Sequence, residues 1–179
     1  MCLCLTEPDA GSDAAAIKTR AVRDGGRYIL SGEKTSITGG MQADVAAVWA
    51  KTDQFAGAKG VTGFLVPLDL PGIERTAFGD MGWRSSERAS ISFDDVSIPV
   101  EYRIGEEGRG FYEIMTTFDW VRVYLCLQVL ALGEQSVRDA IDYARQRTAF
   151  GKPIAKYDAV SFRLVDSLAK IESGRLLCY

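Results

Sequence analysis

The stretch that decides the fold reads Leu5-Thr6-Glu7-Pro8-Asp9-Ala10-Gly11-Ser12-Asp13. It places a proline, a glycine, a serine and three carboxylates in one turn-forming run after an apolar lead-in. Further along comes Gly32-Glu33-Lys34-Thr35-Ser36-Ile37-Thr38-Gly39-Gly40, which we interpret as a strand that ends in a Gly-Gly turn. Glycine allows close approach of the backbone, and hydroxyls donate and accept hydrogen bonds. The two segments together predict two backbone-rich edges that face one ligand.

Composition places the chain among ordinary globular proteins. Its 179 residues are enough for one domain and part of a second. It is 47% hydrophobic and 25% charged, which argues against disorder. The net charge is -3 and the Lys and Arg residues are scattered, so nothing in the charge pattern favours nucleic-acid binding.

The cysteine and histidine content limits the chemistry. The chain has no histidine, and no CxxC pair occurs among Cys2, Cys4, Cys126 and Cys178. This excludes zinc sites of the Cys/His type and histidine-based catalysis, so we expect no metal site. We expect the four cysteines to be reduced and mostly buried, as in a cytoplasmic protein.

Neither a membrane span nor a targeting segment is expected. The longest apolar run, near Tyr124 to Leu132, is interrupted by Gln128 and is too short to cross a bilayer. The first residues lack a basic region and lead straight into a turn, unlike a signal peptide.

The chain changes character near Gly105 to Gly110. Before this point, turn signals bound short apolar runs typical of an antiparallel barrel or sandwich, at 28–30, 45–50, 64–66 and 91–93. After it, apolar residues from Phe111 onward follow helical spacing to a stop near Phe150–Pro153, and a second helical pattern runs from Val160 to the last residue. Two helices cannot cover their own apolar faces, so we expect further helices from the rest of a longer protein or from partner chains.

Five ordered motifs resemble the acyl-CoA dehydrogenase family. They are Thr6 to Asp13, Gly32 to Thr38, Met81-Gly82-Trp83-Arg84, Phe93-Asp94-Asp95-Val96 with Pro99, and Arg147-Thr148-Ala149-Phe150-Gly151-Lys152. The resemblance implies an α+β fold: an antiparallel β-barrel-like domain followed by two long helices of a truncated four-helix bundle. It also implies that residues 1–108 form the family's central β-domain, without its N-terminal part, and that residues 109–179 begin its C-terminal helical domain.

The same resemblance implies an FAD site. In the family, the residues matching Leu5 and Thr6 meet the pyrimidine edge of the flavin, and the one matching Thr38 lies beside flavin N5. The residue matching Ser12 lies near the pyrophosphate and the substrate. Ser36 stands where the family usually has a tryptophan, and Gly39 stands in place of an asparagine. The implied cofactor-binding set is Leu5, Thr6, Gly11, Ser12, Ser36, Ile37, Thr38, Arg147, Phe150 and Asp158. From the residues alone, a turn and a strand without a ligand remain an alternative.

The segment around Arg147 has two interpretations. Taken locally, an arginine at a helix end followed by Phe-Gly is a structural helix terminus. By resemblance, Arg147 reaches the flavin pyrophosphate of a neighbouring subunit, which suits its planar fork of donors, and Phe150 packs near the adenine side. Asp158 replaces the usual glutamine and loses an amide donor.

Asp119 and Arg122 also have two interpretations. Their spacing of three residues fits a surface ion pair on a helix. The resemblance instead places them in the acyl-CoA pocket, together with Ser12, with Arg122 close to the reacting thioester.

The resemblance implies α,β-dehydrogenation of an acyl-CoA by a longer protein. The catalytic base of the family is a glutamate that we expect C-terminal to Tyr179; in the isovaleryl-type branch it matches Val121, which cannot take a proton. No catalytic residue is therefore assigned in this chain. The implied partners are the acyl-CoA, electron-transfer flavoprotein, and copies of the chain in a homotetramer or homodimer, in the bacterial cytoplasm or the mitochondrial matrix. The alternatives are a non-catalytic truncated protein of the same fold and a flavoenzyme like acyl-CoA oxidase or nitroalkane oxidase.

Overall fold

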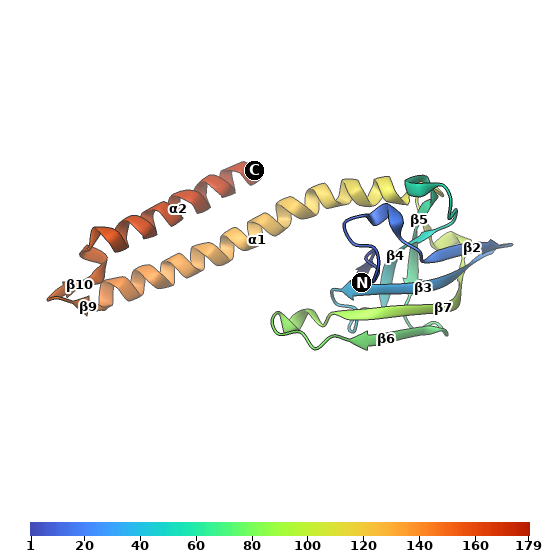
Figure 1. Cartoon of the computed structure of the whole chain (residues 1–179), viewed down its shortest axis with the longest axis horizontal. Coiled ribbons are helices and arrows are strands. Elements are labelled where there is room, and N and C mark those ends of the chain that lie inside the picture. The colour runs from blue at the N-terminus through green and yellow to red at the C-terminus, as the bar shows by residue number, and fades with distance from the viewer. The chain divides into compact units, whose positions relative to one another are not determined.

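The computed structural model describes residues 1–179 and contains two compact units, Met1–Met115 and Thr116–Tyr179. The first unit is built on an eight-stranded sheet and the second on two long helices (Figure 1). The mixed α+β class expected from the sequence is confirmed. The strands of the sheet are β1 (Cys2–Cys4), β2 (Arg20–Asp24), β3 (Arg27–Ile37), β4 (Val45–Lys51), β5 (Val61–Pro67), β6 (Ile73–Ala77), β7 (Ala89–Pro99) and β8 (Arg103–Ile104).

The sheet is open rather than a closed barrel. Its strand order is β6-β7-β3-β2-β4-β5-β8, and β1 pairs with β4 beside this path. Most neighbours are antiparallel, but β1 and β2 each pair with β4 in the parallel sense. The long strands β3 and β7 lie side by side along most of their length (Figure 1). The barrel-like domain expected from the sequence is thus a curved sheet whose ends, β6 and β8, do not pair.

The core of the first unit is the inner face of this sheet. The apolar runs predicted as strands form β3, β4, β5 and β7, and their inward side chains are fully buried, among them Tyr28, Leu30, Val48, Phe64, Ile91 and Ile98. The rings of Tyr28 and Phe64 meet edge to face at 4.9 Å. The Tyr28 hydroxyl donates to Glu107 at 2.6 Å, so the one polar atom of this aromatic pair is satisfied.

A bulge interrupts β3 shortly before its end. The register against β7 shifts between Lys34 and Ile37, and Ser36 has a left-handed backbone with φ of 58°. Bulges bend a strand and redirect its side chains, and they are frequent next to binding sites. The Gly32–Gly40 segment therefore contains a β-bulge where the sequence predicted a regular strand.

Helix α1 (Gly110–Gln146) begins directly against the sheet. Trp49 on β4 donates its indole N–H to the carbonyl of Gly110 at 3.0 Å, and Ile114 is fully buried. A Cβ on Gly110 would lie 2.7 Å from the backbone nitrogen of Gly63 on β5. Only glycine permits this approach of helix to strand.

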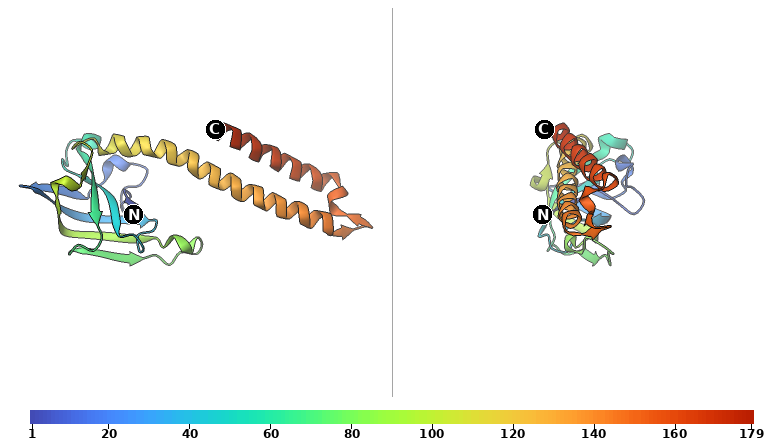
Figure 2. Two further views of the ribbon diagram at one scale, coloured as in Figure 1. Left: turned by 180° about the vertical axis from the view of Figure 1, so that it is seen from behind. Right: turned by 90° about the vertical axis from the view of Figure 1, so that its left-hand side faces the viewer.

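In the second unit α1 runs beside α2 (Asp158–Cys178) in the opposite direction (Figure 2). A short hairpin joins them, made by β9 (Thr148–Ala149) and β10 (Lys152–Pro153). Glu134 on α1 and Arg175 on α2 form an ion pair between the helices. Both predicted helices are confirmed, including the stop near Phe150. The division between the compact units falls within α1, at Met115, and the predicted boundary falls just before this helix.

Helix α1 is more apolar than the run around Gln128 indicated. By length and composition alone it could cross a membrane, and only 6% of its most apolar window is buried. An apolar helix that packs within a bundle has the same composition, so this is weak evidence for a membrane span. The four cysteines form no disulfide. Cys2 and Cys4 are buried as expected, whereas Cys178 is half-buried and Cys126 on α1 is exposed, so the expected burial holds for two of the four cysteines.

Candidate functional site

The structure brings the two informative segments of the sequence side by side. The backbone N–H of Thr35 donates to the carbonyl of Thr6 at 2.9 Å. The ammonium of Lys34 donates to the carbonyl of Leu5 at 3.0 Å. The turn after β1 and the bulge in β3 therefore form one continuous polar edge at the end of the first unit's sheet.

The hydroxyl groups along this edge are available to a ligand. The side chains of Thr6, Ser12, Ser36 and Thr38 make no hydrogen bond within the chain, and all except half-buried Thr6 are exposed. A Cβ on Gly11 would meet nothing within 4 Å, so the space beside this residue is open. The flat ring of a flavin has carbonyl and N–H groups along its edges, and its tail carries phosphates. This set of free hydroxyls and open backbone fits such a group.

Leu5 and Ile37 contribute to this edge through their backbones only. Their side chains are 5% and 2% exposed and point into the core. They hold the two segments on the sheet and leave the polar groups of Thr6 and Thr38 outward. This division follows from the alternation of side chains along an extended chain.

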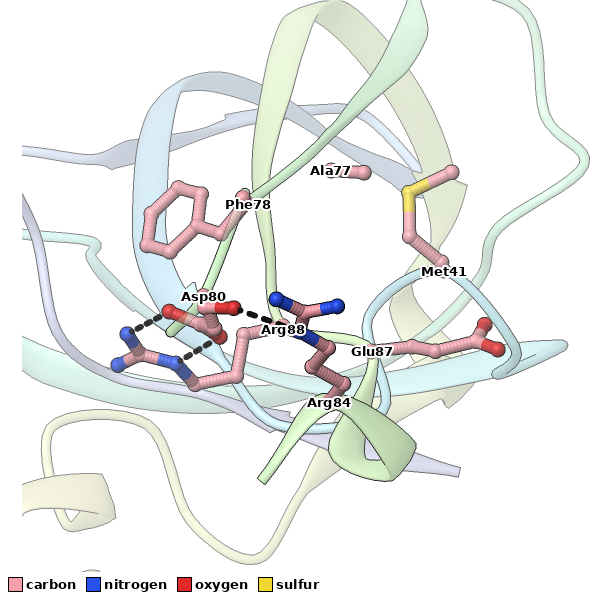
Figure 3. A pocket seen from close by; sticks show the side chains of 8 residues that line it. Met41, Ala77, Phe78, Asp80, Arg84, Glu87 and Arg88 are labelled. Atoms are coloured by element: carbon pink, nitrogen blue, oxygen red, sulfur yellow. Dashed lines mark hydrogen bonds and ion pairs between the residues drawn. The ribbon is translucent and has the colours of Figure 1, made fainter. Parts of the chain in front are cut away.

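A cavity of about 470 Å³ lies next to the Gly39–Gly40 turn (Figure 3). The loop between β6 and β7 forms one wall and is tied to the turn, because Gly39 N–H donates to the carbonyl of Ser86 at 2.6 Å. Side chains that line the cavity are Met41, Ala77, Phe78, Asp80, Arg84, Glu87 and Arg88.

The polar wall of this cavity is organised by Asp80 and Arg88. The Arg88 guanidinium forms two hydrogen bonds to the Asp80 carboxylate, at 2.6 and 2.9 Å, and lies over the ring of Phe78 at 5.2 Å (Figure 3). The hydrogen bond from Arg88 holds the pKa of the Asp80 carboxyl below its usual value. Sequence reasoning singled out residues 81–84 as a motif but missed these two residues. The only signal was a pair of opposite charges on either side of a Gly-containing loop.

In the second unit, Arg147 and Phe150 lie on the hairpin between the helices. The Arg147 carbonyl accepts from the N–H of Ile154 at 2.8 Å, while its guanidinium makes no bond within the chain. Phe150 is 97% exposed and has a φ of 50°, in the left-handed region. An exposed aromatic side chain on a strained turn is costly for an isolated chain and is typical of a contact surface. Asp158 is the first residue of α2 and is exposed.

Asp119 and Arg122 form an ion pair of 2.6 Å on α1, with side chains 73% and 67% exposed. This geometry is the surface pair that their spacing predicts. Arg122 also stands at one end of an apolar groove of about 650 Å³ between α1 and α2. Other residues of the groove are Val123, Leu125, Cys126, Val129, Leu130, Gly174, Leu177 and Cys178. The side chain of Val121 is half-buried on the same helix.

Two family models match the chain. The acyl-CoA dehydrogenase middle domain matches residues 2–96 and the acyl-CoA dehydrogenase C-terminal domain matches residues 108–179. The polar edge lies within the first match, and the hairpin with Arg147 lies within the second.

Similar proteins cover nearly the whole chain. A short-chain specific acyl-CoA dehydrogenase of Megasphaera elsdenii is 41% identical over 177 residues, which is 98% of this chain and 46% of that protein. The three-dimensional structure of butyryl-CoA dehydrogenase from the same organism is 38% identical, with a TM-score of 0.96 over 99% of this chain and 47% of that one.

A structure described as the electron transferring flavoprotein of Acidaminococcus fermentans, in work on flavin-based electron bifurcation, matches equally well. Its TM-score is 0.96 at 38% identity, over 99% of this chain and 47% of that one. The chain thus spans about half the length of the curated relatives it matches. Its sequence, its sheet and its helix pair agree in every comparison: the chain belongs to the acyl-CoA dehydrogenase family.

Proposed function

We propose that the full-length protein containing this sequence binds FAD and dehydrogenates an acyl-CoA thioester between its α and β carbons. The observation that carries the proposal is the hydrogen bond between Thr35 and Thr6, which joins two segments rich in free hydroxyls into one edge within the family's middle domain. The relatives named above are short-chain and butyryl-CoA dehydrogenases, which favours a short acyl group.

On this proposal the chain's own residues bind and orient. Thr6 and Thr38 donate hydrogen bonds from the polar edge to the flavin ring. Ser12 binds the pyrophosphate and the acyl-CoA. When bound, FAD accepts a hydride from the substrate. Donors fixed before binding stabilise the charge that develops on the thioester carbonyl without reorganisation.

The hairpin of the second unit is proposed to complete the cofactor site of a neighbouring subunit. Arg147 has the fork of donors that suits a pyrophosphate, and the Phe150 side chain is free to pack against an aromatic ring system. This requires a homo-oligomer of the full-length protein. Removal of the α-proton is assigned to a carboxylate outside this chain, because Val121 carries no titratable group.

The proposed electron acceptor is an electron-transfer flavoprotein. Support comes from the match to the structure whose description names such a protein. The proposed acyl-CoA, acceptor and oligomer all belong to the longer protein and not to this chain alone.

The test is to express the full-length protein, remove its cofactor and titrate it with FAD. We expect a yellow holoprotein that reduces a dye acceptor, or an electron-transfer flavoprotein, in the presence of butyryl-CoA. A colourless protein that takes up no FAD contradicts the proposal. Turnover with molecular oxygen and not with the dye or the flavoprotein would assign the protein to the oxidases instead.

A further inference from the structure

One ion pair in the chain differs from all the others. Lys34 and Glu7 meet at 2.8 Å with side chains only 0% and 5% exposed. In every other ion pair both side chains are at least 19% exposed. Exposed pairs contribute little, whereas a buried pair is costly unless every charged atom finds a partner. The burial of this pair therefore needs a reason.

The Glu7 carboxylate is satisfied on both oxygens. One oxygen accepts from the Lys34 ammonium and from the backbone N–H of Thr19 at 3.0 Å. The other accepts from the backbone N–H of Lys18 at 2.5 Å. Because Glu7 and Lys18 stand at the two ends of the loop that contains Gly11 and Ser12, one buried carboxylate closes this loop at its base.

Lys34 fixes the opposite side of the same edge. Its ammonium also donates to the carbonyl of Leu5 at 3.0 Å, and the next residue, Thr35, donates to the carbonyl of Thr6. Thr6 therefore lies between Leu5 and Glu7, which both bind the Lys34 ammonium. The β3 bulge at Ser36 comes two residues after Lys34 in the sequence. Burial lowers the pKa of the Lys34 ammonium, and the nearby Glu7 carboxylate partly offsets this effect.

We propose that Glu7 and Lys34 are positioning residues of the cofactor site: their buried ion pair holds Thr6, the Ser12 loop and the β3 bulge in the arrangement that a flavin meets. This inference rests on the proposed function. Replacing a buried pair by neutral residues of similar size is often nearly neutral for stability, while removing one partner is strongly destabilising. Positioning and folding can therefore be separated experimentally.

The experiment uses the full-length protein and three variants: Glu7→Gln, Lys34→Met and the double variant. The matched control is Asp9→Asn, which breaks the exposed Asp9–Lys18 pair on the same loop. Three quantities are measured: the FAD dissociation constant of the apoprotein, its thermal midpoint, and the rate of proteolytic cleavage within residues 8–17 without cofactor.

Each single variant is expected to bind FAD at least roughly tenfold more weakly, a loss of about 1.4 kcal/mol, and to be cleaved faster in the loop. The double variant is expected to recover thermal stability but not FAD affinity. Asp9→Asn is expected to match the unaltered protein in all three measurements.

Two results overturn the inference. The first is FAD affinity that recovers together with stability in the double variant, which makes the pair purely structural. The second is loop cleavage that is unchanged in both single variants. If the unaltered protein itself takes up no FAD, the proposed function fails, and the cleavage rates still report whether the pair orders the loop.

Discussion

At the scale of single residues, Arg147 has a guanidinium that makes no bond within the chain and can therefore bind a group outside it. Its guanidinium is free on an exposed hairpin, and the proposed function assigns it to a pyrophosphate on a neighbouring subunit. A hydrogen bond to a charged group contributes about 1.5–3 kcal/mol. Arg147→Ala is therefore expected to weaken FAD binding by roughly 10- to 150-fold in the full-length protein.

Fluorescence titration of the apoprotein with FAD measures this change. Arg147→Lys should regain part of the affinity, because it keeps the charge and loses the two-pronged geometry. Arg145→Ala is the control, since Arg145 lies on the same helix end and makes only a long contact of 4.0 Å to Asp142. If the Arg147→Ala protein keeps an intact oligomer and an unchanged FAD affinity, Arg147 binds no ligand and only forms part of the helix terminus.

The Glu7 carboxyl makes the stability of the first unit depend on pH. Burial raises the pKa of its carboxyl, but the charge and hydrogen bonds of Lys34 and the N–H of Lys18 outweigh burial and hold the pKa below the ordinary 4.5. A carboxyl whose pKa is lower in the folded than in the unfolded state stabilises the fold. The full contribution is present at a pH above the pKa of the unfolded state, and it is lost as the pH falls through the pKa of the folded state.

We therefore expect the thermal midpoint to fall below about pH 4.5, and to fall less steeply in Glu7→Gln, where this titration is removed. Differential scanning calorimetry between pH 7 and pH 3 on the full-length protein measures both slopes. Asp80→Asn is a useful comparison, because the Asp80 pKa is also lowered, by Arg88. Identical slopes in Glu7→Gln and the unaltered protein would contradict the expectation.

At the scale of elements, the junction between α1 and the sheet depends on Gly110. Alanine is the better helix former, so Gly110→Ala would stabilise a helix that touched nothing. Here the added Cβ lies 2.7 Å from Gly63 N and 2.8 Å from the carbonyl carbon of Thr62, and neither backbone atom can move aside cheaply. Overpacking of this kind typically costs about 1–3 kcal/mol.

We expect Gly110→Ala to lower the thermal midpoint of the protein measurably, and Gly82→Ala to leave it nearly unchanged. Gly82 is a matched control because a Cβ there meets no atom within 4 Å. A Gly110→Ala protein as stable as the unaltered one would mean that the start of α1 does not rest on β5.

At the scale of the whole molecule, the second unit exposes a large apolar surface. Large side chains on α1 and α2 are more than half exposed, among them Trp120, Tyr124, Val129, Leu132, Phe162 and Leu177. Contiguous apolar surface of this kind marks contact sites or causes aggregation. Residues 108–179 match the acyl-CoA dehydrogenase C-terminal domain, and further helices that cover this surface stay a prediction from the sequence.

The chain of 179 residues by itself is therefore expected to self-associate. Light scattering after size exclusion should show species larger than 19.6 kDa, and the association should weaken with Val129→Glu. Phe55→Ser is the control, because Phe55 is fully exposed on a loop of the first unit. A monodisperse monomer at micromolar concentration would contradict this expectation.

The strands and helices were predictable because their patterns are local. Short apolar runs bounded by turn signals are visible along β3, β4, β5 and β7, and the spacing after Phe111 identifies α1 without any knowledge of its neighbours. The apposition of the two informative segments also followed, once both were interpreted as edges of one site.

The details of the site were less predictable because they depend on distant pairings. Lysine is almost never fully buried, and the burial of Lys34 makes sense only with Glu7, 27 residues away. The bulge at Ser36 arises from the register against β7, and the Asp80–Arg88 wall exists only once the loop between β6 and β7 folds back. The exposure of Cys126 was missed because burial was inferred from residue type alone.

The indole of Trp49 provides an intrinsic optical reporter at the root of α1. It is 7% exposed and bonded to Gly110, whereas Trp83 and Trp120 are 70% and 77% exposed. A buried indole emits at shorter wavelength and is shielded from iodide, so with Trp83 and Trp120 each replaced by phenylalanine the blue fraction of the chain's tryptophan fluorescence comes from Trp49. Detachment of the first helical turn would appear as a red shift of that fraction alone, while the sheet remained folded by circular dichroism.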